Sequence, residues 1–204
     1  MIDYYFTTIS PFSYLGHKAL MKIAQETGAG INFKPFNLFG VWDNSGAVPP
    51  GQRPPVRQRY RFLELQRVAV MRDTCLNLKP EHFPTDPSKA DHCICALIKS
   101  GVDPADFCFE AGRAVWERNM QVADDSVLKQ LLEECGHDAD NVLALVDSPE
   151  VSDMREANTK SAIENDAVGA PAYVYQGEVF WGQDRLEYLE QMIVSGRNPF
   201  SADL

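Results

Sequence analysis

Two serines, Ser10 and Ser13, lie where a short apolar segment ends and an expected helix begins. Pro11 suits the first helical position, so Ser10 precedes a helix whose first N–H groups have no helical partners. These groups and the positive end of the helix dipole stabilise a negative charge placed beside them. A hydroxyl that donates a hydrogen bond to a thiolate lowers the pKa of that thiol further. Ser10 therefore suits an anion or thiolate site, and the alternative is a simple N-cap.

Ala170 and Pro171 precede an apolar segment that is expected to form a strand. A cis proline at such a position interrupts the hydrogen-bond ladder and leaves the N–H and C=O of the preceding residue free. Those groups can pair with a bound peptide in the manner of a β-strand. Since only about 5–6% of X-Pro bonds in folded proteins are cis, the alternative is a trans Pro171 that starts the strand.

An expected strand ends at Trp181, and an expected helix begins at Asp184. Gly182 permits a sharp turn there, and the backbone N–H groups that follow can bind a carboxylate. Gln183 can add a hydrogen bond to that carboxylate, and Asp184 can pair with an ammonium group. In the alternative, Asp184 and Glu187 form a capping box, which is compatible with ligand binding by the neighbouring residues.

The hydrophobic pattern places these segments in an α/β fold. The sequence predicts strands at 2–6, 31–35, 172–175 and 179–181, helices at 11–26, 56–75, 87–99, 104–118, 124–134, 139–146, 149–166 and 184–193, and an irregular loop at 36–53. This order indicates a thioredoxin-like fold with a large all-helical domain inserted between its βαβ and ββα halves. We expect a thioredoxin-like domain at 1–35 and 168–204, and a substrate loop with the helical domain at 36–167.

In thioredoxin-fold oxidoreductases a reactive Cys-x-x-Cys motif stands where this chain has Ser10 and Ser13. A hydroxyl cannot form the mixed disulfide that disulfide exchange requires, so the site must hold the thiol of another molecule. Glutathione is the expected cofactor, because it is a tripeptide that can pair with Ala170 while its sulfur faces Ser10. Its γ-glutamyl carboxylate and ammonium groups then fit Gln183 and Asp184.

The composition is that of a globular protein and disfavours several partners. The 204 residues are 45% hydrophobic, which is enough for a sizeable core. The formal net charge of −10 repels phosphate backbones, so no nucleic-acid partner is expected. No segment is long and apolar enough to span a bilayer, and the N-terminus lacks a secretory pattern. We therefore expect a cytoplasmic protein without membrane contact.

The cysteines do not form a disulfide framework, because the five are an odd number and all lie in the middle of the chain. Cys93 and Cys95 are two residues apart, so on a helix they point in different directions. No second pair has the spacing of a zinc site. We expect buried, inert thiols and no bound metal.

Three motifs together resemble those of the 2-hydroxychromene-2-carboxylate isomerase family. They are Ser-Pro-Phe-Ser-Tyr-Leu-Gly at 10–16, Gly-Ala-Pro-Ala at 169–172 and Phe-Trp-Gly-Gln-Asp-Arg-Leu at 180–186. The resemblance covers essentially the whole chain, and the family has a DsbA-like thioredoxin fold related to kappa-class glutathione transferases. It implies a glutathione-dependent isomerase of aromatic degradation. Such an enzyme interconverts 2-hydroxychromene-2-carboxylate and trans-o-hydroxybenzylidenepyruvate, by reversible addition of a glutathione thiolate that Ser10 stabilises.

The resemblance also implies a set of site residues. Ser10 corresponds to the catalytic serine, and Ala170 to the residue before the cis proline. The implied glutathione-binding residues are Ser10, Ala170, Pro171, Trp181, Gly182, Gln183 and Asp184. Relatives are commonly dimers, so a homodimer is expected.

The substrate half of the site departs from the family pattern. Isomerases of the family can use a lysine in the loop after the second strand, and that loop contains no lysine here. Trp42 stands near the expected place, where it can cover an aromatic ring. Arg53 can anchor a carboxylate, and Asn44 is a further polar contact. Arg57 is a second candidate anchor, for which the alternative is a solvated surface cation.

Two other functions remain open from the sequence. One is a kappa-like glutathione transferase that conjugates an aromatic electrophile and releases the conjugate. The other is a non-catalytic glutathione-binding module that has kept the fold. In each enzymatic case the substrate is a small aromatic carboxylate or electrophile.

Overall fold

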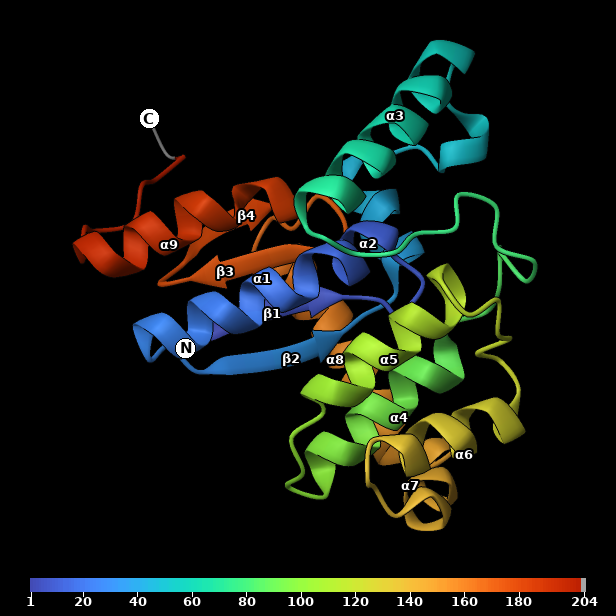
Figure 1. Cartoon of the computed structure of the whole chain (residues 1–204). Helices are drawn as coiled ribbons and strands as arrows, with labels where there is room; N and C mark the ends of the chain where they lie inside the picture. The colour runs from blue at the N-terminus through green and yellow to red at the C-terminus, as the bar shows by residue number, and fades with distance from the viewer. Residues whose placement is uncertain (203–204) are drawn as a thin grey trace.

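The strands come from the two ends of the chain, and most of the helices lie between them (Figure 1). The computed structural model describes residues 1–202, so the last two residues of the expected 168–204 segment lie outside the described part. The strands are β1 (Ile2–Phe6), β2 (Ile31–Pro35), β3 (Ala172–Tyr175) and β4 (Glu178–Trp181). The helices are α1 (Pro11–Thr27), α2 (Leu38–Ser45), α3 (Pro55–Met71), α4 (Ser88–Lys99), α5 (Ala105–Trp116), α6 (Asp125–Glu134), α7 (Ala139–Val146), α8 (Pro149–Glu164) and α9 (Leu186–Ser195), with 3₁₀ helices η1 (Pro50–Gln52) and η2 (Gln183–Arg185). This order confirms the predicted thioredoxin-like fold with a helical insert.

The four strands form one mixed sheet in the order β2-β1-β3-β4. β1 pairs in parallel with β2 and antiparallel with β3, and β3 pairs antiparallel with β4. Gln176 and Gly177 join β3 to β4. Their φ angles are 52° and 86°, and a type I′ hairpin turn requires positive φ at both of these positions. The sheet therefore has the β1 strand, which leads to Ser10, near its centre.

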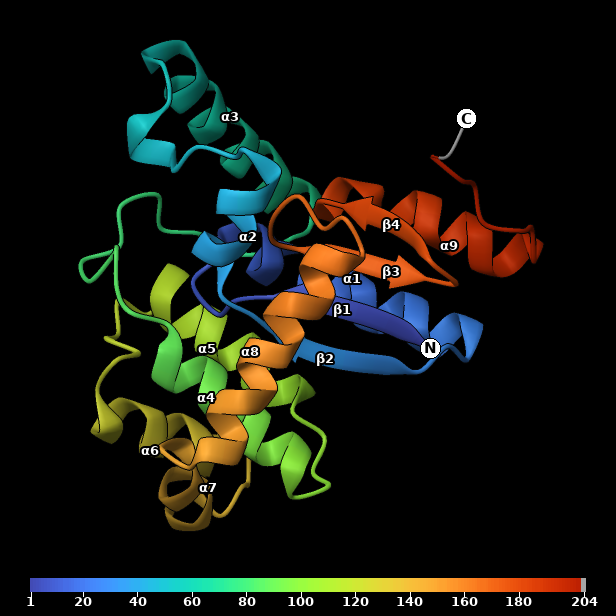
Figure 2. The same ribbon diagram turned by 180° about the vertical axis from the view of Figure 1, so that it is seen from behind.

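Helices cover both faces of the sheet, because successive residues of the central strand point to opposite sides. Tyr4 packs into the core that α1 and α9 share, whereas Tyr5 packs with Val174 against Ala162 of α8. Figure 1 shows α1 and α9 over one face, and Figure 2 shows α8 over the other. Helices α4 to α7 form a separate block beside the β2 edge, and α3 projects from the molecule.

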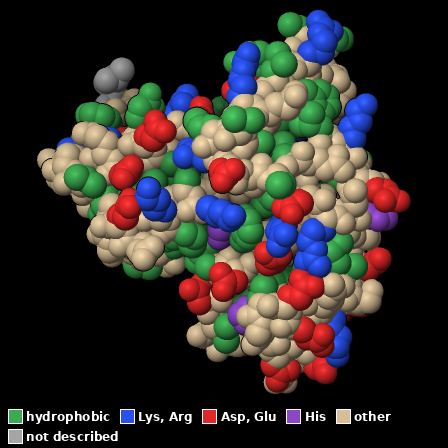
Figure 3. Space-filling view, in the orientation of Figure 1, with side chains coloured by type: hydrophobic (Ala, Val, Ile, Leu, Met, Phe, Trp, Pro, Cys, Tyr) green, Lys and Arg blue, Asp and Glu red, His purple; other side chains and the backbone are tan. Residues whose placement is uncertain are grey.

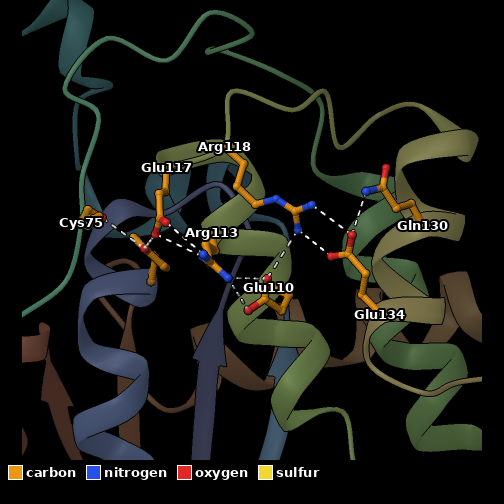
Figure 4. A network of polar contacts seen from close by, with 8 residues as sticks. Cys75, Glu110, Arg113, Glu117, Arg118, Gln130 and Glu134 are labelled. Atoms are coloured by element: carbon orange, nitrogen blue, oxygen red, sulfur yellow. Dashed lines mark hydrogen bonds and ion pairs between the residues drawn. The ribbon is translucent and has the colours of Figure 1, made fainter.

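A polar network joins α1 to the helical block (Figure 4). The single hydroxyl proton of Tyr14 on α1 is shared between a carboxylate oxygen of Glu117, 3.2 Å away, and the backbone oxygen of Cys75, 3.1 Å away. Arg113 holds Glu117 in turn, and this hydrogen bonding lowers the pKa of the Glu117 carboxyl. The network continues over α5 and α6 through Glu110, Arg118, Gln130 and Glu134. It fixes α1, whose first residue follows Ser10, against the insert.

The structure differs from the sequence prediction at 36–53, which is not an irregular loop. Asn37 caps α2 by accepting a hydrogen bond from the N–H of Phe39, and Gly46 ends it with φ of 71°. Val41 is fully buried in the same core as Ala162 of α8. The segment is rich in Gly, Asn and Ser, yet caps at both ends and one buried face make a helix.

Three cysteines are buried as expected, and burial raises the pKa of Cys93 and of Cys95 to about 12. Cys75 is exposed, so the prediction of uniformly buried thiols is wrong there. Within residues 1–202 no helix is long and apolar enough to cross a membrane.

Candidate functional site

A large cavity lies where β1 ends and α1 begins. Its volume is about 1320 Å³. It is lined by the β1–α1 connection, α2, the 46–51 segment, one face of α3, the 83–88 segment, and residues 168–170 and 181–185. Pockets that hold one small ligand usually measure roughly 300–1,000 Å³. This central cavity therefore has room for a cofactor and a substrate together.

Ser10 lies in the wall of the central cavity, with only 5% of its surface exposed. It is the N-cap of α1, and its Oγ accepts a hydrogen bond from the N–H of Ser13 (3.2 Å). The same hydroxyl donates to the carbonyl oxygen of Ala170 (3.3 Å). The capping bond uses a lone pair of the hydroxyl, so its proton can turn from Ala170 to a ligand atom. Capping and ligand binding are thus compatible.

Ser13 behaves differently from Ser10. Its side-chain oxygen is buried, makes no hydrogen bond within residues 1–202, and does not line the central cavity. Only the first of the two serines is therefore available to a ligand.

The Ala170–Pro171 peptide bond is cis, so the trans alternative is wrong. Ala170 lines the central cavity, and Pro171 is buried behind it. The carbonyl oxygen of Pro171 accepts a hydrogen bond from the N–H of Gly182 (2.9 Å). This hydrogen bond joins the segment of Ala170 and Pro171 to the turn at Gly182, beside Ser10.

Gln183 is 2% exposed and lies in the wall of the central cavity. Arg72 donates from Nε to its side-chain oxygen (3.0 Å) and from a terminal nitrogen to its backbone oxygen (3.1 Å). Because the side-chain oxygen faces Arg72, the amide nitrogen of Gln183 is the group oriented to donate elsewhere. The sequence did not identify Arg72, which lies in the turn after α3 with no neighbouring motif.

Gly16 allows this close packing. A Cβ at Gly16 would lie 2.6 Å from the Cβ of Gln183, so α1 approaches η2 only because this residue is glycine.

Asp184 is exposed at the edge of the central cavity and forms an ion pair with Arg185 (2.8 Å). The capping box with Glu187 is wrong, because α9 begins at Leu186 after η2 and has no side-chain cap. Gly182 has φ of 103°, and a Cβ there would lie 2.4 Å from a carboxylate oxygen of Asp184. The turn thus requires glycine. Trp181, 51% exposed, completes this wall.

The structure brings two of the three substrate-binding candidates to the central cavity. Trp42 and Arg53 line it, whereas Asn44 is exposed and does not. Asn44 is two residues from Trp42 on α2, and residues two apart on a helix point in different directions, while Ser45 shares the face of Trp42. Asn44 is therefore corrected to a surface residue. The indole nitrogens of Trp42 and of Trp181 both lie close to Gly169, where a Cβ would come within 3.3 Å and 3.1 Å of them.

The connection that carries Ser10 is held by a buried ion pair that the sequence did not reveal. Asp91 of α4 is fully buried and accepts hydrogen bonds from Thr7 and from the backbone and side chain of Thr8, each at 3.0 Å. Arg155 of α8 binds the same carboxylate at 3.0 Å. Burial raises the pKa of Asp91, and Arg155 and the threonines oppose this shift. The helical insert thus fixes the residues just before Ser10.

These groups fit a tripeptide thiol cofactor. A buried hydroxyl at a helix N-terminus, the backbone carbonyl of Ala170 just before β3 and the Gln183 amide share one cavity wall. They match a thiol, a peptide backbone and a carboxylate respectively. Within the described residues no group of three or more His, Cys, Asp or Glu side chains is arranged to hold a metal ion.

Comparisons with known proteins agree with the observed fold. Residues 1–194 match the family described as DSBA-like thioredoxin domain. The 2-hydroxychromene-2-carboxylate isomerase of Sphingobium xenophagum is 31% identical over 196 residues, covering 95% of this chain and 97% of that protein. Human glutathione S-transferase kappa 1 is 22% identical, covering 94% of this chain and 90% of that protein. A solved structure of a 2-hydroxychromene-2-carboxylate isomerase has a TM-score of 0.79 and 27% identity, covering 95% of this chain and 94% of that one.

Proposed function

We propose that this chain, which belongs to the DSBA-like thioredoxin family and within it to the 2-hydroxychromene-2-carboxylate isomerases, is a glutathione-dependent isomerase. Its substrate pair in this proposal is 2-hydroxychromene-2-carboxylate and trans-o-hydroxybenzylidenepyruvate. The observation that carries the proposal is the Ser10–Ala170 hydrogen bond, which joins a hydroxyl and a backbone acceptor in the wall of one cavity.

Each residue of the cofactor wall has a proposed task. The Ser10 hydroxyl donates a hydrogen bond to the thiolate, which the N-terminus of α1 also stabilises. Ala170, released from Ser10, accepts a backbone N–H of the tripeptide. The Gln183 amide and the N–H groups after Gly182 bind the γ-glutamyl carboxylate, and Asp184 receives the ammonium group. Trp181 completes the surface on which the cofactor lies, and the buried Pro171 positions Ala170 from behind.

Bound glutathione supplies a nucleophilic sulfur that adds reversibly to the conjugated substrate and leaves it again, so that no glutathione is consumed. In the substrate half of the cavity, Trp42 covers the aromatic ring and Arg53 binds its carboxylate. Burial and the neighbouring Arg57 lower the pKa of Arg53, and a bound anion opposes both effects because it favours the charged guanidinium.

The test is an isomerisation assay with glutathione present and absent. The proposal predicts that 2-hydroxychromene-2-carboxylate is converted only when glutathione is present. The concentration of glutathione should stay constant during the reaction, because none is consumed. Equal rates without glutathione contradict the cofactor. Stoichiometric loss of glutathione to a conjugate of an aromatic electrophile indicates the transferase, and tight glutathione binding without any turnover indicates the binding module.

We further propose a homodimer in the cytoplasm, with a cofactor domain at 1–35 and 168–204 and a substrate domain at 36–167. Exposed apolar side chains on the projecting α3 support self-association, since Val56, Tyr60 and Leu63 are 63%, 56% and 49% exposed. Sedimentation equilibrium decides between a monomer and a dimer, and a Tyr60→Glu variant is expected to dissociate the dimer.

A further inference from the structure

The arginines that line the central cavity fall into two groups. Arg67 pairs with Glu64, Arg155 with Asp91, and Arg185 with Asp184. The remaining three form no ion pair with a carboxylate within residues 1–202, and they are Arg53, Arg57 and Arg61. We call these three the arginine cluster.

The arginine cluster lies on the inner face of the projecting arm of the chain. Arg57 and Arg61 are four residues apart on α3, so they lie on the same side of the helix. Arg53 precedes them, and its Nε donates to the backbone oxygen of Val48 (2.7 Å). Gln58 donates to the backbone oxygens of Gly51 and Arg53, which folds the turn back onto the start of α3. The cluster is thereby held facing the cavity.

No carboxylate within residues 1–202 forms an ion pair with the arginine cluster, in which Arg53 and Arg61 are partly buried and Arg57 is exposed. Burial lowers the pKa of Arg61, and the nearby positive charge of Arg53 lowers it further. The whole chain carries a formal net charge of −10, yet in Figure 3 the arm at the upper right displays Lys and Arg side chains among hydrophobic ones. Gathering like charges in a partly desolvated cavity costs free energy unless an anion binds there.

One carboxylate needs at most two guanidinium groups, since a single arginine already binds a carboxylate with two parallel hydrogen bonds. Three unpaired arginines along one wall therefore exceed what a monocarboxylate requires. The aromatic side chains of Phe39 and Trp42 line the same cavity, with ring centroids 5.5 Å apart. An aromatic body with two acidic groups matches both features.

We propose that the arginine cluster binds a second carboxylate, so that aromatic dicarboxylates bind in the substrate half of the cavity more tightly than aromatic monocarboxylates of the same size. This inference rests on the proposed function, because it assumes that glutathione occupies the Ser10 side of the cavity. Both the aromatic ligand and the glycyl residue of glutathione could supply a carboxylate to the cluster. In this proposal the second carboxylate belongs to the aromatic ligand. Arg53 binds the first carboxylate, and Arg57 with Arg61 binds the second.

The test measures binding and needs no turnover. Benzene-1,3-dicarboxylate is compared with 3-carbamoylbenzoate, which has the same size and one charge fewer, by calorimetry on the full chain in the presence of glutathione. We expect the dicarboxylate to bind roughly tenfold or more tightly, as loss of a charge-assisted pair implies. Arg61→Gln is expected to reduce the ratio of the two affinities to near one.

The matched control is Arg59→Gln, because Arg59 lies on the same helix, is exposed and does not line the cavity. It is expected to keep the wild-type ratio. Equal affinities of the two ligands in the wild type overturn the inference, whatever the isomerase assay gives. Weaker glutathione binding in Arg61→Gln with an unchanged ligand ratio also overturns it, because the anion is then the glycyl carboxylate. Absence of isomerisation with the ratio intact contradicts the proposed function alone.

Discussion

The Ser10 side chain combines two tasks that the sequence presents as alternatives. Its oxygen caps α1 by accepting from Ser13, and its proton is donated to Ala170. A hydroxyl has one proton and two lone pairs, so neither bond excludes the other. The acceptor of the proton is a backbone group that a bound peptide can also use. A ligand thiolate therefore only has to replace Ala170 as the acceptor.

Ser10→Ala is predicted to lower kcat/KM for isomerisation by roughly 10- to 100-fold, because it removes a hydrogen bond to a charged sulfur. It also removes an N-cap, which costs about 1 kcal/mol of stability. Steady-state kinetics with saturating glutathione checks the first effect, and urea unfolding measures the second. Ser13→Ala is the control and should retain activity. An equal loss of activity in both variants would contradict the assignment of Ser10.

His17 makes the stability of the protein depend on pH. It is 4% exposed among the rings of Tyr4, Phe33 and Phe109, and burial lowers its pKa from 6.5 to about 4. The unfolded chain therefore binds a proton first as the pH falls, so this contribution to stability is complete above pH 6.5 and is lost progressively toward pH 4.

The expected loss from His17 between pH 7 and pH 5 is about 2 kcal/mol of unfolding free energy. Urea unfolding at the two pH values measures it. His17→Gln should flatten the dependence by about that amount, whatever its own effect on stability. If the unfolding free energy of His17→Gln changes with pH as much as that of the wild type, another group is responsible.

At the scale of elements, the site depends on the close approach of α1 and η2. Gly16→Ala places a methyl group 2.6 Å from the Cβ of Gln183, so one of the two elements must move. Overpacking of this kind costs about 1–3 kcal/mol. We also expect weaker glutathione binding, because Gln183 shifts. Gly40→Ala on α2 is the control, since its new Cβ would meet Thr159 at an ordinary 3.4 Å. Calorimetry measures the affinity of each variant for glutathione. Equal affinities of Gly16→Ala and Gly40→Ala would contradict the role of Gly16 in placing Gln183.

The Asp91–Arg155 pair connects the helical insert to the residues before Ser10. Asp91→Asn leaves Arg155 without its carboxylate in a mostly buried place, which costs about 3–5 kcal/mol. The comparison is Asp125→Asn, which leaves the exposed Lys89 without this carboxylate and should cost far less, because exposed ion pairs contribute little to stability. Urea unfolding measures the difference between the two variants. Similar small losses in both would mean that the buried pair does not hold the connection.

At the scale of the whole molecule, the fold was predictable because the four strands and most of the helices carry their own hydrophobic period. The α2 helix was missed because its stability comes from Val41 against α8, a contact made with a segment more than a hundred residues away. Ser10, Ala170 and Gln183 were predictable because each adjoins a local turn or helix signal. Arg72, Asp91 and Arg155 were not, since each reaches the site only through the tertiary fold.

The central claim is that this molecule holds the thiolate of another molecule at Ser10. The most direct measurement is the ultraviolet absorbance of the thiolate of bound glutathione as a function of pH, in the wild type and in Ser10→Ala. A free cysteine thiol has a pKa near about 8.5. We predict that the thiol bound to the wild type titrates at least about one unit lower, and that Ser10→Ala moves the titration back toward the free value. A thiol that titrates at the free value in the wild type, or at the same pH in both proteins, would contradict the claim.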